Sequence, residues 1–354
     1  MCYTLYIATF ILSSYRGEHP DSTGKWYINK TFIIILIYFA AILNGFGASI
    51  LWLAQGKYTA MCANDSNKGL FNGTFWAIFM SANIVGYLMS AFVLGAVKSL
   101  SVFYLIMTII CFCSSLFFLF LSKPDPHPEE ASAVKEAADE QKVTMSATWD
   151  LMKSKRMRPL LPVFISSAYS VSFFSALFIP YMTFHMNGLN YTDAEEEKLA
   201  LLAMIGLGVG EILGSIVHGR IIDRFSLRTA IYCILGCYIF ALFWVVLFNA
   251  IEYFAMWRAV VMTFSWGFYD SGNMTFVNSM CGFQFESKSV PFSVFLVVQS
   301  FMVFVFLIYA STVTTTAQYY IFFLVGILAN SVSFASVLCF FEPKPKESKQ
   351  DDAF

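Results

Sequence analysis

Two carboxylates, Glu211 and Asp270, lie near the middle of long apolar segments of this 354-residue chain, and Lys and Arg are absent from the centres of those segments. A charged side chain at the centre of a membrane-spanning helix costs about 2.5–3.5 kcal/mol on insertion scales. Such side chains usually face the interior of a helix bundle, where they bind protons, ions or polar solutes. The pair is therefore the first place to look for function.

Small and polar residues share a helical face with each carboxylate, because residues three, four and seven apart point the same way. Ser215 and His218 follow Glu211 at such spacings, and Asn273 follows Asp270. One interpretation is an ion or substrate site lined by Glu211, Asp270, Ser215, His218 and Asn273. The other is a set of hydrogen bonds that anchor helices to one another. The residues alone leave both interpretations open.

The elements that must position these residues are long apolar helices. Apolar residues make up 58 % of the chain and charged residues 13 %, against about 25 % charged in a soluble domain. Runs of about 20 apolar residues cross a bilayer as helices, because lipid offers no partner to unpaired backbone groups. We expect an all-α, polytopic transmembrane bundle with spans near 1–15 (partial), 31–53, 70–97, 100–121, 160–186, 199–222, 228–250, 255–282, 290–310 and 319–341.

Several function classes find no support in the composition. The formal net charge of −1 gives no reason to expect a nucleic-acid partner, and the eight cysteines show no metal-ligand spacing. Residues suited to catalysis do not gather at one depth, so we expect no enzyme activity, no bound metal and no cofactor. Gly206, Gly210 and Gly214 recur every fourth residue, which predicts close helix packing; a dinucleotide site would need a preceding strand.

One connection is much longer than the others and divides the chain. Residues 122–159 are rich in charges of both signs, which predicts a cytosolic linker between an N-terminal half at 1–121 and a six-helix half at 160–341; residues 342–354 form a tail. A transporter built from two six-helix halves would show six spans before the linker. Four spans, the first one short, suggest that two helices and part of a third precede the sequence. A ten-helix protein is the alternative.

The distribution of basic residues predicts an orientation. Sixteen Lys and Arg residues lie on the side of the long linker and six on the other, so the positive-inside rule places the linker in the cytosol. The sequons at Asn29 and Asn190 then face outward and are expected to carry glycans, whereas those at Asn64 and Asn72 face the cytosol. We expect a multi-pass protein of the plasma membrane or an endomembrane.

A charged turn between two spans has a distinctive spacing. Gly219-Arg220-Ile221-Ile222-Asp223-Arg224, followed by Arg228, resembles the signature of the major facilitator superfamily in its second-half position, with Ser226 where the family often has Gly. In this pattern Gly219 allows close helix approach, while Asp223 can sit against a helix N-terminus and pair with the arginines. The resemblance implies a structural or gating role for Gly219, Asp223, Arg224 and Arg228.

Three further stretches are similar to the uncoordinated-93-like family. Residues 45–58 hold an A-x-x-x-W-x-x-Q-G-x-Y pattern, whose most specific members are Trp52, Gln55, Gly56 and Tyr58. Residues 206–214 resemble the family's G-x-G-E-x-x-G helix. Residues 266–271, with Gln299 and Ser300 in the following span, resemble its late G-x-x-D helix. The similarity extends from the first partial helix to Phe341.

This resemblance implies a major facilitator fold and a choice of functions. Some members of the family regulate a potassium channel complex, and others escort membrane receptors during trafficking. Our leading expectation is regulation of a partner membrane protein such as a potassium channel complex. The alternatives are a proton-coupled secondary transporter of a small solute, working through Glu211 or Asp270, and a trafficking escort for membrane receptors.

Overall fold

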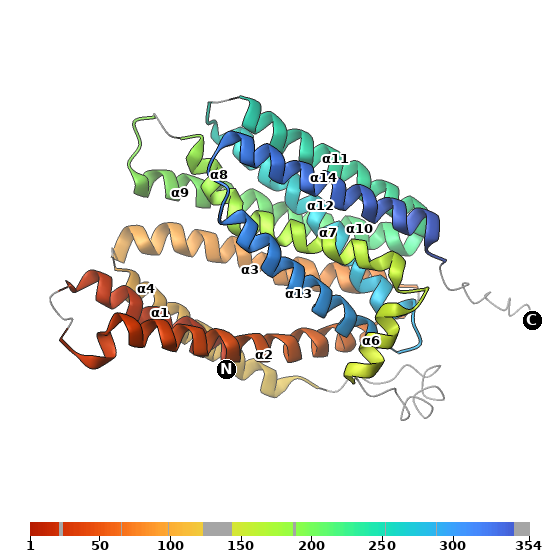
Figure 1. Ribbon diagram of the computed structural model, residues 1–354, viewed down its shortest axis with the longest axis horizontal. Helices are drawn as coiled ribbons and strands as arrows, with labels where there is room; N and C mark the ends of the chain where they lie inside the picture. Colours follow the sequence, from red (N-terminus) through yellow and green to blue (C-terminus); the bar gives the residue numbers. More distant parts are fainter. Residues whose placement is uncertain are drawn as a thin grey trace, which may run out of the picture.

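In the computed structural model the chain forms an all-helical bundle, described at residues 1–20, 24–64, 66–97, 99–122, 144–186, 189–251, 253–287 and 289–342 (Figure 1). The prediction of an all-α polytopic bundle is confirmed. The α-helices, in chain order, are α1 (Cys2–Glu18), α2 (Lys30–Cys62), α3 (Lys68–Val97), α4 (Leu100–Leu116), α6 (Met145–Lys153), α7 (Leu161–Ser172), α8 (Phe178–Phe184), α9 (Asp193–Ala203), α10 (Ile205–Arg224), α11 (Leu227–Ala250), α12 (Met256–Phe283), α13 (Val290–Ala310) and α14 (Thr316–Phe340).

Seven helical segments of the described chain are long and apolar enough to cross a membrane. They are Lys30–Cys62, Leu100–Phe120, Arg158–Phe184, Glu195–Arg224, Leu227–Ala250, Val290–Ala310 and Thr316–Phe340. The other three expected spans form the helices α1, α3 and α12. Helix α1 has 17 residues, fewer than a full crossing needs. Helix α12 is long enough but too polar, and the bundle encloses it, since 21 of its 28 residues are buried.

Helix α3 lies between two groups of helices (Figure 1). On one side α1 packs against α2 and α4; on the other side α10 packs against both α3 and α12. The main core lies in this second group, where Tyr169, Phe173, Trp266 and Phe322 form a buried aromatic cluster with ring centroids 4.6–6.3 Å apart. Aromatic rings in such contact bury large apolar surfaces. The second group therefore gives the polar residues of α10 and α12 a rigid surrounding.

The end of α1 is bonded to the start of α4. The carboxylate of Glu18, the last residue of α1, accepts hydrogen bonds from the Ser101 hydroxyl at 2.6 Å, the Ser101 backbone N–H at 3.1 Å and the Ser99 hydroxyl at 3.1 Å. Ser99 is the N-cap of α4. These bonds, chiefly the one from the Ser101 hydroxyl, hold the pKa of Glu18 below its ordinary value of 4.5.

Part of the expected linker is folded. Helix α6 begins after Thr144, whose Oγ1 accepts a hydrogen bond from the backbone N–H of Ala147 at 3.1 Å, and it packs against α13. Thr148 and Met157 are buried against the bundle. Residues 144–159 of the expected linker are therefore folded against the bundle, because their few apolar side chains find a surface to cover. Residues 123–143 and 343–354 lie outside the described residues.

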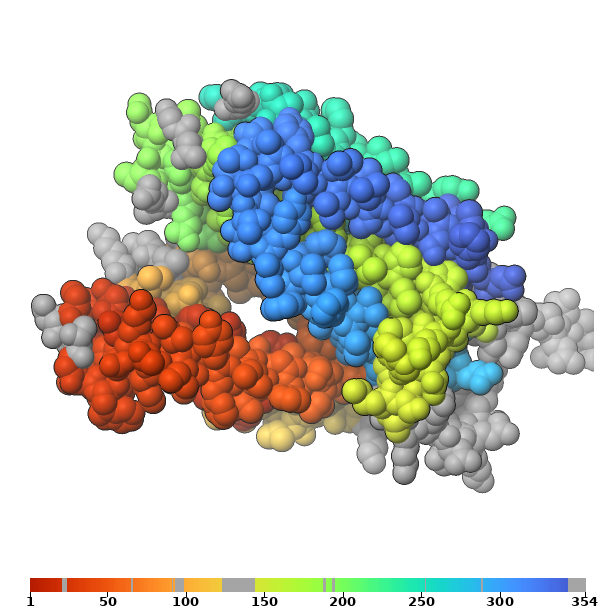
Figure 2. Space-filling model, viewed as in Figure 1, coloured from red at the N-terminus to blue at the C-terminus, as the bar shows by residue number. Residues whose placement is uncertain are grey.

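Helices α2 and α13 meet at one end and then diverge. At the meeting point Gly56 is buried, because the ring of Phe292 occupies the space that a side chain would fill. Beyond this contact the two helices leave an open cleft between them, which Figure 2 shows from the front.

Candidate functional site

The two central carboxylates lie on the neighbouring helices α10 and α12, each on the side that packs against the other helix. Glu211 on α10 is 0 % exposed and Asp270 on α12 is 1 % exposed. Gly267, three residues before Asp270, lies against the Glu211 side chain and the backbone of Leu207. Because Gly267 has no side chain to separate the helices, the two carboxyl groups lie within electrostatic range of each other.

A third helix contributes a partner that sequence reasoning missed. Asn83 on α3 donates a hydrogen bond from Nδ2 to Oε2 of Glu211 at 3.2 Å. The signal was present in the sequence, since Asn83 is the one amide in the apolar stretch from Phe75 to Val97. A lone amide at the depth of a carboxylate is a candidate for an interhelical hydrogen bond.

Three carboxylate oxygens find no hydrogen-bond partner among the described residues: Oε1 of Glu211 and both oxygens of Asp270. Ser170 lies beside Asp270, and its hydroxyl accepts the indole N–H of Trp266 at 3.0 Å. Burial of an isolated, ionised carboxylate reduces folding stability by roughly several kcal/mol, unless a proton or a cation neutralises its charge. The arrangement is thus chemically suited to hold a proton or a small cation.

The other three residues expected at this site are buried in different surroundings. Ser215 donates its hydroxyl to the carbonyl of Ile212, and its own carbonyl lies against Gly73 of α3. Asn273 borders a small gap among α7, α11, α12 and α14. The ring of His218 lies over Gly272 of α12 and faces Cys237 of α11. The structure therefore brings Glu211 and Asp270 together with Asn83, whereas the described contacts of Ser215, His218 and Asn273 are with other groups.

The charged turn joins α10 to α3. Oδ1 of Asp223 accepts the backbone N–H of Gly69 at 2.6 Å, and Oδ2 accepts that of Leu70 at 2.8 Å. Asp223 thus sits against the N-terminus of α3, as the pattern predicted, where unpaired N–H groups and the helix dipole favour an anion. The expected pairing with arginine is wrong within the described chain, where Arg224 and Arg228 are exposed and make no ion pair with Asp223. Two fixed amide donors already satisfy the carboxylate.

Glycines hold α10 in backbone contact with both neighbours. Gly206, Gly210 and Gly214 lie directly against the α12 backbone, and a methyl group at Gly210 would overlap the carbonyl oxygen of Phe264. Gly219 contacts the backbone of Gly69 on α3 in the same way. The prediction of close packing at these glycines is confirmed, and α10 lies in backbone contact with both α3 and α12.

The residues of the family pattern on α2 serve contacts to neighbouring segments. Trp52 donates its indole N–H to the Tyr3 hydroxyl at 3.3 Å and stacks on Trp76 of α3 at 6.1 Å. The hydroxyl of Tyr58 donates to the carbonyl of Ser122 at 3.1 Å. Gln55 donates to Thr59 on its own helix at 2.9 Å. With Gly56 against α13, these contacts hold α2 in place.

A helical bundle with long apolar spans and a buried pair of carboxylates defines a multi-pass integral membrane protein. Residues 26–341 match the family described as "Ion channel regulatory protein UNC-93", and the chain belongs to that family. The resemblance seen in the sequence is confirmed. The family's description names a regulatory role.

Relatives of the same family are distant in sequence. The chain is 24 % identical to UNC93-like protein MFSD11 of Xenopus tropicalis over 200 residues, which are 51 % of this chain and 44 % of that protein. It is 23 % identical to Protein unc-93 homolog A of Bos taurus over 300 residues, which are 70 % of this chain and 62 % of that protein. The chain therefore spans about half to three fifths of the length of these relatives.

Proposed function

We propose that this protein is a regulatory subunit of a partner membrane protein, with a potassium channel complex as the leading partner. The observation that carries the proposal is the family match, which covers residues 26–341 and names ion channel regulation. The choice of potassium comes from the resemblance at Trp52–Tyr58, Gly206–Gly214 and Trp266–Ser271.

The packing of α10 supports a scaffold role. A regulatory subunit needs a stable surface, whereas alternating access requires one group of helices to rock against the other. Helix α10 contacts the backbones of α3 and α12 through glycines, and Asp223 and Glu211 bond to α3 at two depths. These contacts favour a fixed arrangement.

A surface for the partner is available on α13. Its uncovered face carries a stripe of exposed apolar side chains at helical spacing: Val297, Phe301, Phe304 and Ile308. This helix borders the open cleft opposite α2 (Figure 2). A transmembrane helix of the partner would pack against such a stripe through van der Waals contact.

The test combines current measurement with site-specific photo-crosslinking. Whole-cell potassium current is recorded with and without the full chain, and a photo-reactive amino acid replaces Phe301 on α13 or Tyr232 on α11. The two positions are 64 % and 58 % exposed, so they are matched in accessibility. We expect a changed current and a channel adduct from position 301 only. A receptor adduct with unchanged current would instead favour the trafficking role, and equal adducts from both positions would refute the α13 surface.

Proton-coupled transport is the second candidate, favoured by the unpartnered oxygens of Glu211 and Asp270. The purified chain is reconstituted into vesicles with an entrapped pH-sensitive dye, and a potassium diffusion potential drives proton entry. If the protein is a regulatory subunit, we expect no protein-dependent proton flux. The Glu211→Gln variant should then change the channel current as much as the wild type does. A proton flux that Glu211→Gln or Asp270→Asn abolishes would overturn that proposal and establish the transporter.

A further inference from the structure

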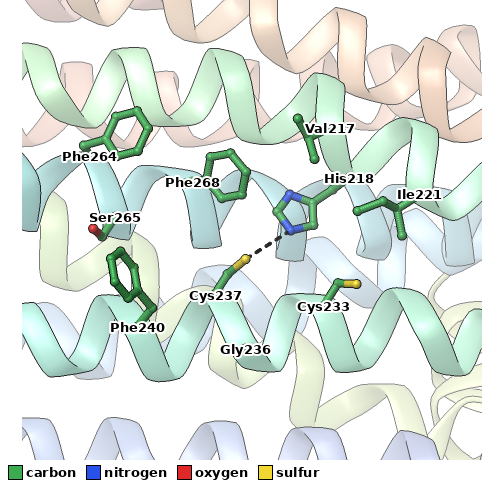
Figure 3. Close-up of a pocket in the computed structure, with 10 residues that line it drawn as sticks. All are labelled: Val217, His218, Ile221, Cys233, Gly236, Cys237, Phe240, Phe264, Ser265 and Phe268. Atoms are coloured by element: carbon green, nitrogen blue, oxygen red, sulfur yellow. Dashed lines mark hydrogen bonds between the residues drawn. The ribbon is translucent and has the colours of Figure 1, made fainter.

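A cavity of about 530 Å³ lies between α10 and α11, with α12 as its floor (Figure 3). Helix α11 packs mainly on α12 and touches α10 much less, which leaves room between α10 and α11. The lining is almost wholly apolar and includes Val217, Ile221, Phe240, Phe264 and Phe268. Pockets of about 300–1,000 Å³ with apolar walls and a few polar groups are typical small-molecule sites.

The cavity opens sideways, toward lipid. Val217 and Phe240 at its rim are 41 % and 54 % exposed. The outward face of α11 beside the opening is also apolar and exposed, at Tyr232, Ile239 and Phe243. A water-soluble molecule has no favourable route across such a face, so the occupant must come from the membrane.

The polar side chains of the lining are His218, Cys233, Cys237 and Ser265, and the Ser265 hydroxyl already donates to the carbonyl of Val261 at 2.7 Å. His218 Nδ1 lies 2.8 Å from the carbonyl oxygen of Gly214, which can only accept, so Nδ1 carries the ring hydrogen. In the neutral ring Nε2 is then an acceptor, and it faces the Cys237 sulfur at 3.7 Å (Figure 3). A thiol is a weak donor. A hydroxyl group entering the cavity would therefore be a better partner for Nε2 than the thiol is.

The position of this pair sets the direction in which a ligand would lie. His218 is six residues from Arg224 at the cytosolic end of α10, which is about 9 Å along the helix. Phe240 and Phe264 line the part of the cavity farther from that end (Figure 3). An occupant with one polar end would place that end at His218 and its apolar body among the rings.

We propose that this cavity binds a sterol, with its hydroxyl donating to Nε2 of His218 and its fused rings against Phe240, Phe264 and Phe268. The aromatic walls match a flat, rigid apolar body, and the imidazole acceptor of His218, which faces only a weak thiol donor, matches its hydroxyl. A phospholipid tail would fill the same space without offering a donor to His218. The site is separate from Glu211 and Asp270 and does not depend on either function proposed above.

The first test blocks the cavity without disturbing the fold. A cholesterol analogue carrying a diazirine and an alkyne is photo-crosslinked to the purified full chain, with unlabelled cholesterol as competitor. Gly236 lines the cavity, and a Cβ atom added there meets nothing within 4 Å, so Gly236→Leu should fill the space without a clash. Gly45 on α2 is equally unobstructed and lies away from the cavity, which makes Gly45→Leu the matched control.

We expect competable labelling of α10 and α11 peptides in the wild type and in Gly45→Leu, and its loss in Gly236→Leu with an unchanged melting temperature. Gly236→Ala serves as a milder variant should the leucine lower the folded yield. Equal labelling in Gly236→Leu and Gly45→Leu would overturn the proposal. Stronger labelling of the cavity by a diazirine fatty acid than by the sterol probe would also overturn it.

The second test addresses the hydrogen bond. In the wild type, cholesterol should compete about tenfold better than its methyl ether, which cannot donate; tenfold corresponds to about 1.4 kcal/mol, within the range of one hydrogen bond. His218→Phe keeps the apolar volume and removes the acceptor, so the two competitors should become equivalent. Equivalent competition already in the wild type would rule out the assigned role of His218.

Discussion

Asn83 on α3 and Glu211 on α10 are joined by a hydrogen bond of 3.2 Å between the two helices. The bond satisfies one oxygen of a carboxyl group whose other oxygen has no partner in the described chain. It also connects α3 to α10 far from the charged turn at Asp223. The carboxylate is therefore part of the structure that holds α3 and α10 together, whatever else it does.

Replacement of Asn83 should therefore lower the stability of the folded protein. Asn83→Ala leaves Oε2 of Glu211 buried without its donor, and we expect a loss of about 1–3 kcal/mol in unfolding free energy. Thermal unfolding in detergent measures it. Ser81→Ala is the control, because the exposed Ser81 hydroxyl bonds only to Ile78 of its own helix. The double variant with Glu211→Leu should recover part of the loss; additive losses would contradict this account.

The carboxylate of Asp223 should matter more than the neighbouring arginine. Asp223→Ala removes two charge-assisted bonds to the start of α3, with an expected loss of about 1.5–3 kcal/mol. Arg224→Gln removes an exposed charge without an ion pair to Asp223 and should change stability by less than about 0.5 kcal/mol. Melting temperatures of the two variants decide the matter. Equal losses would mean that the turn acts through its net charge.

Substitution of a glycine of α10 should reduce the yield of folded protein much more than substitution of a glycine in an open position. Gly210→Ala forces a methyl group into the carbonyl of Phe264, so we expect a reduced yield of monodisperse protein in size-exclusion chromatography. Gly45→Ala meets no neighbouring atom and should leave the yield equal or improved, because alanine favours a helix by up to about 1 kcal/mol. A normal yield for Gly210→Ala would show that α10 and α12 can move apart at little cost.

Glu18 predicts a dependence of stability on pH. Its pKa in the folded protein is below the ordinary value of 4.5, chiefly because the Ser101 hydroxyl donates to the ionised form. Its contribution is therefore complete above pH 4.5 and is lost as the pH falls through the lowered value. The difference in melting temperature between the wild type and Glu18→Gln should be present at neutral pH and shrink below pH 4.5. A difference that grows on acidification would have the wrong sign.

Glycosylation tests the orientation of the bundle. Asn29 and Asn190 are exposed, and we expect a glycosidase to shift the mobility of the expressed protein until both are replaced by Gln. Asn72 is 3 % exposed within α3 and its side chain bonds to the carbonyl of Lys68, so Asn72→Gln should leave the glycan pattern unchanged. A glycan on Asn64 would place the linker outside the cytosol.

The helices could be predicted because membrane spans are long and their apolar composition is nearly continuous. The contacts between neighbouring helices were harder to predict from the sequence. Gly210 and Gly214 indicated close packing, but the spacing along one helix does not name the partner helix, so the role of Asn83 went unseen. His218 shares a face with Glu211, yet seven residues separate them by about 10 Å along the axis. Both lie against α12, but the polar partner of Glu211 is on α3 and that of His218 is on α11. The turn pattern placed Asp223 against a helix N-terminus, which its bonds to the backbone amides of α3 bear out, whereas the ion pairs that Arg224 and Arg228 suggested are absent from the described chain.

The enclosed position of α12 has a consequence for how the protein is made. Arg258, Asp270, Asn273 and Asn278 leave this helix too polar to belong to the seven apolar spans, although the finished bundle buries it. A segment with such a composition is poorly retained when it leaves the translocation channel alone, since each central charge opposes insertion. Helices α10 and α11 precede it and provide the walls that α12 needs. We therefore expect α12 to enter the bilayer after α10 and α11 and to depend on them for its retention there.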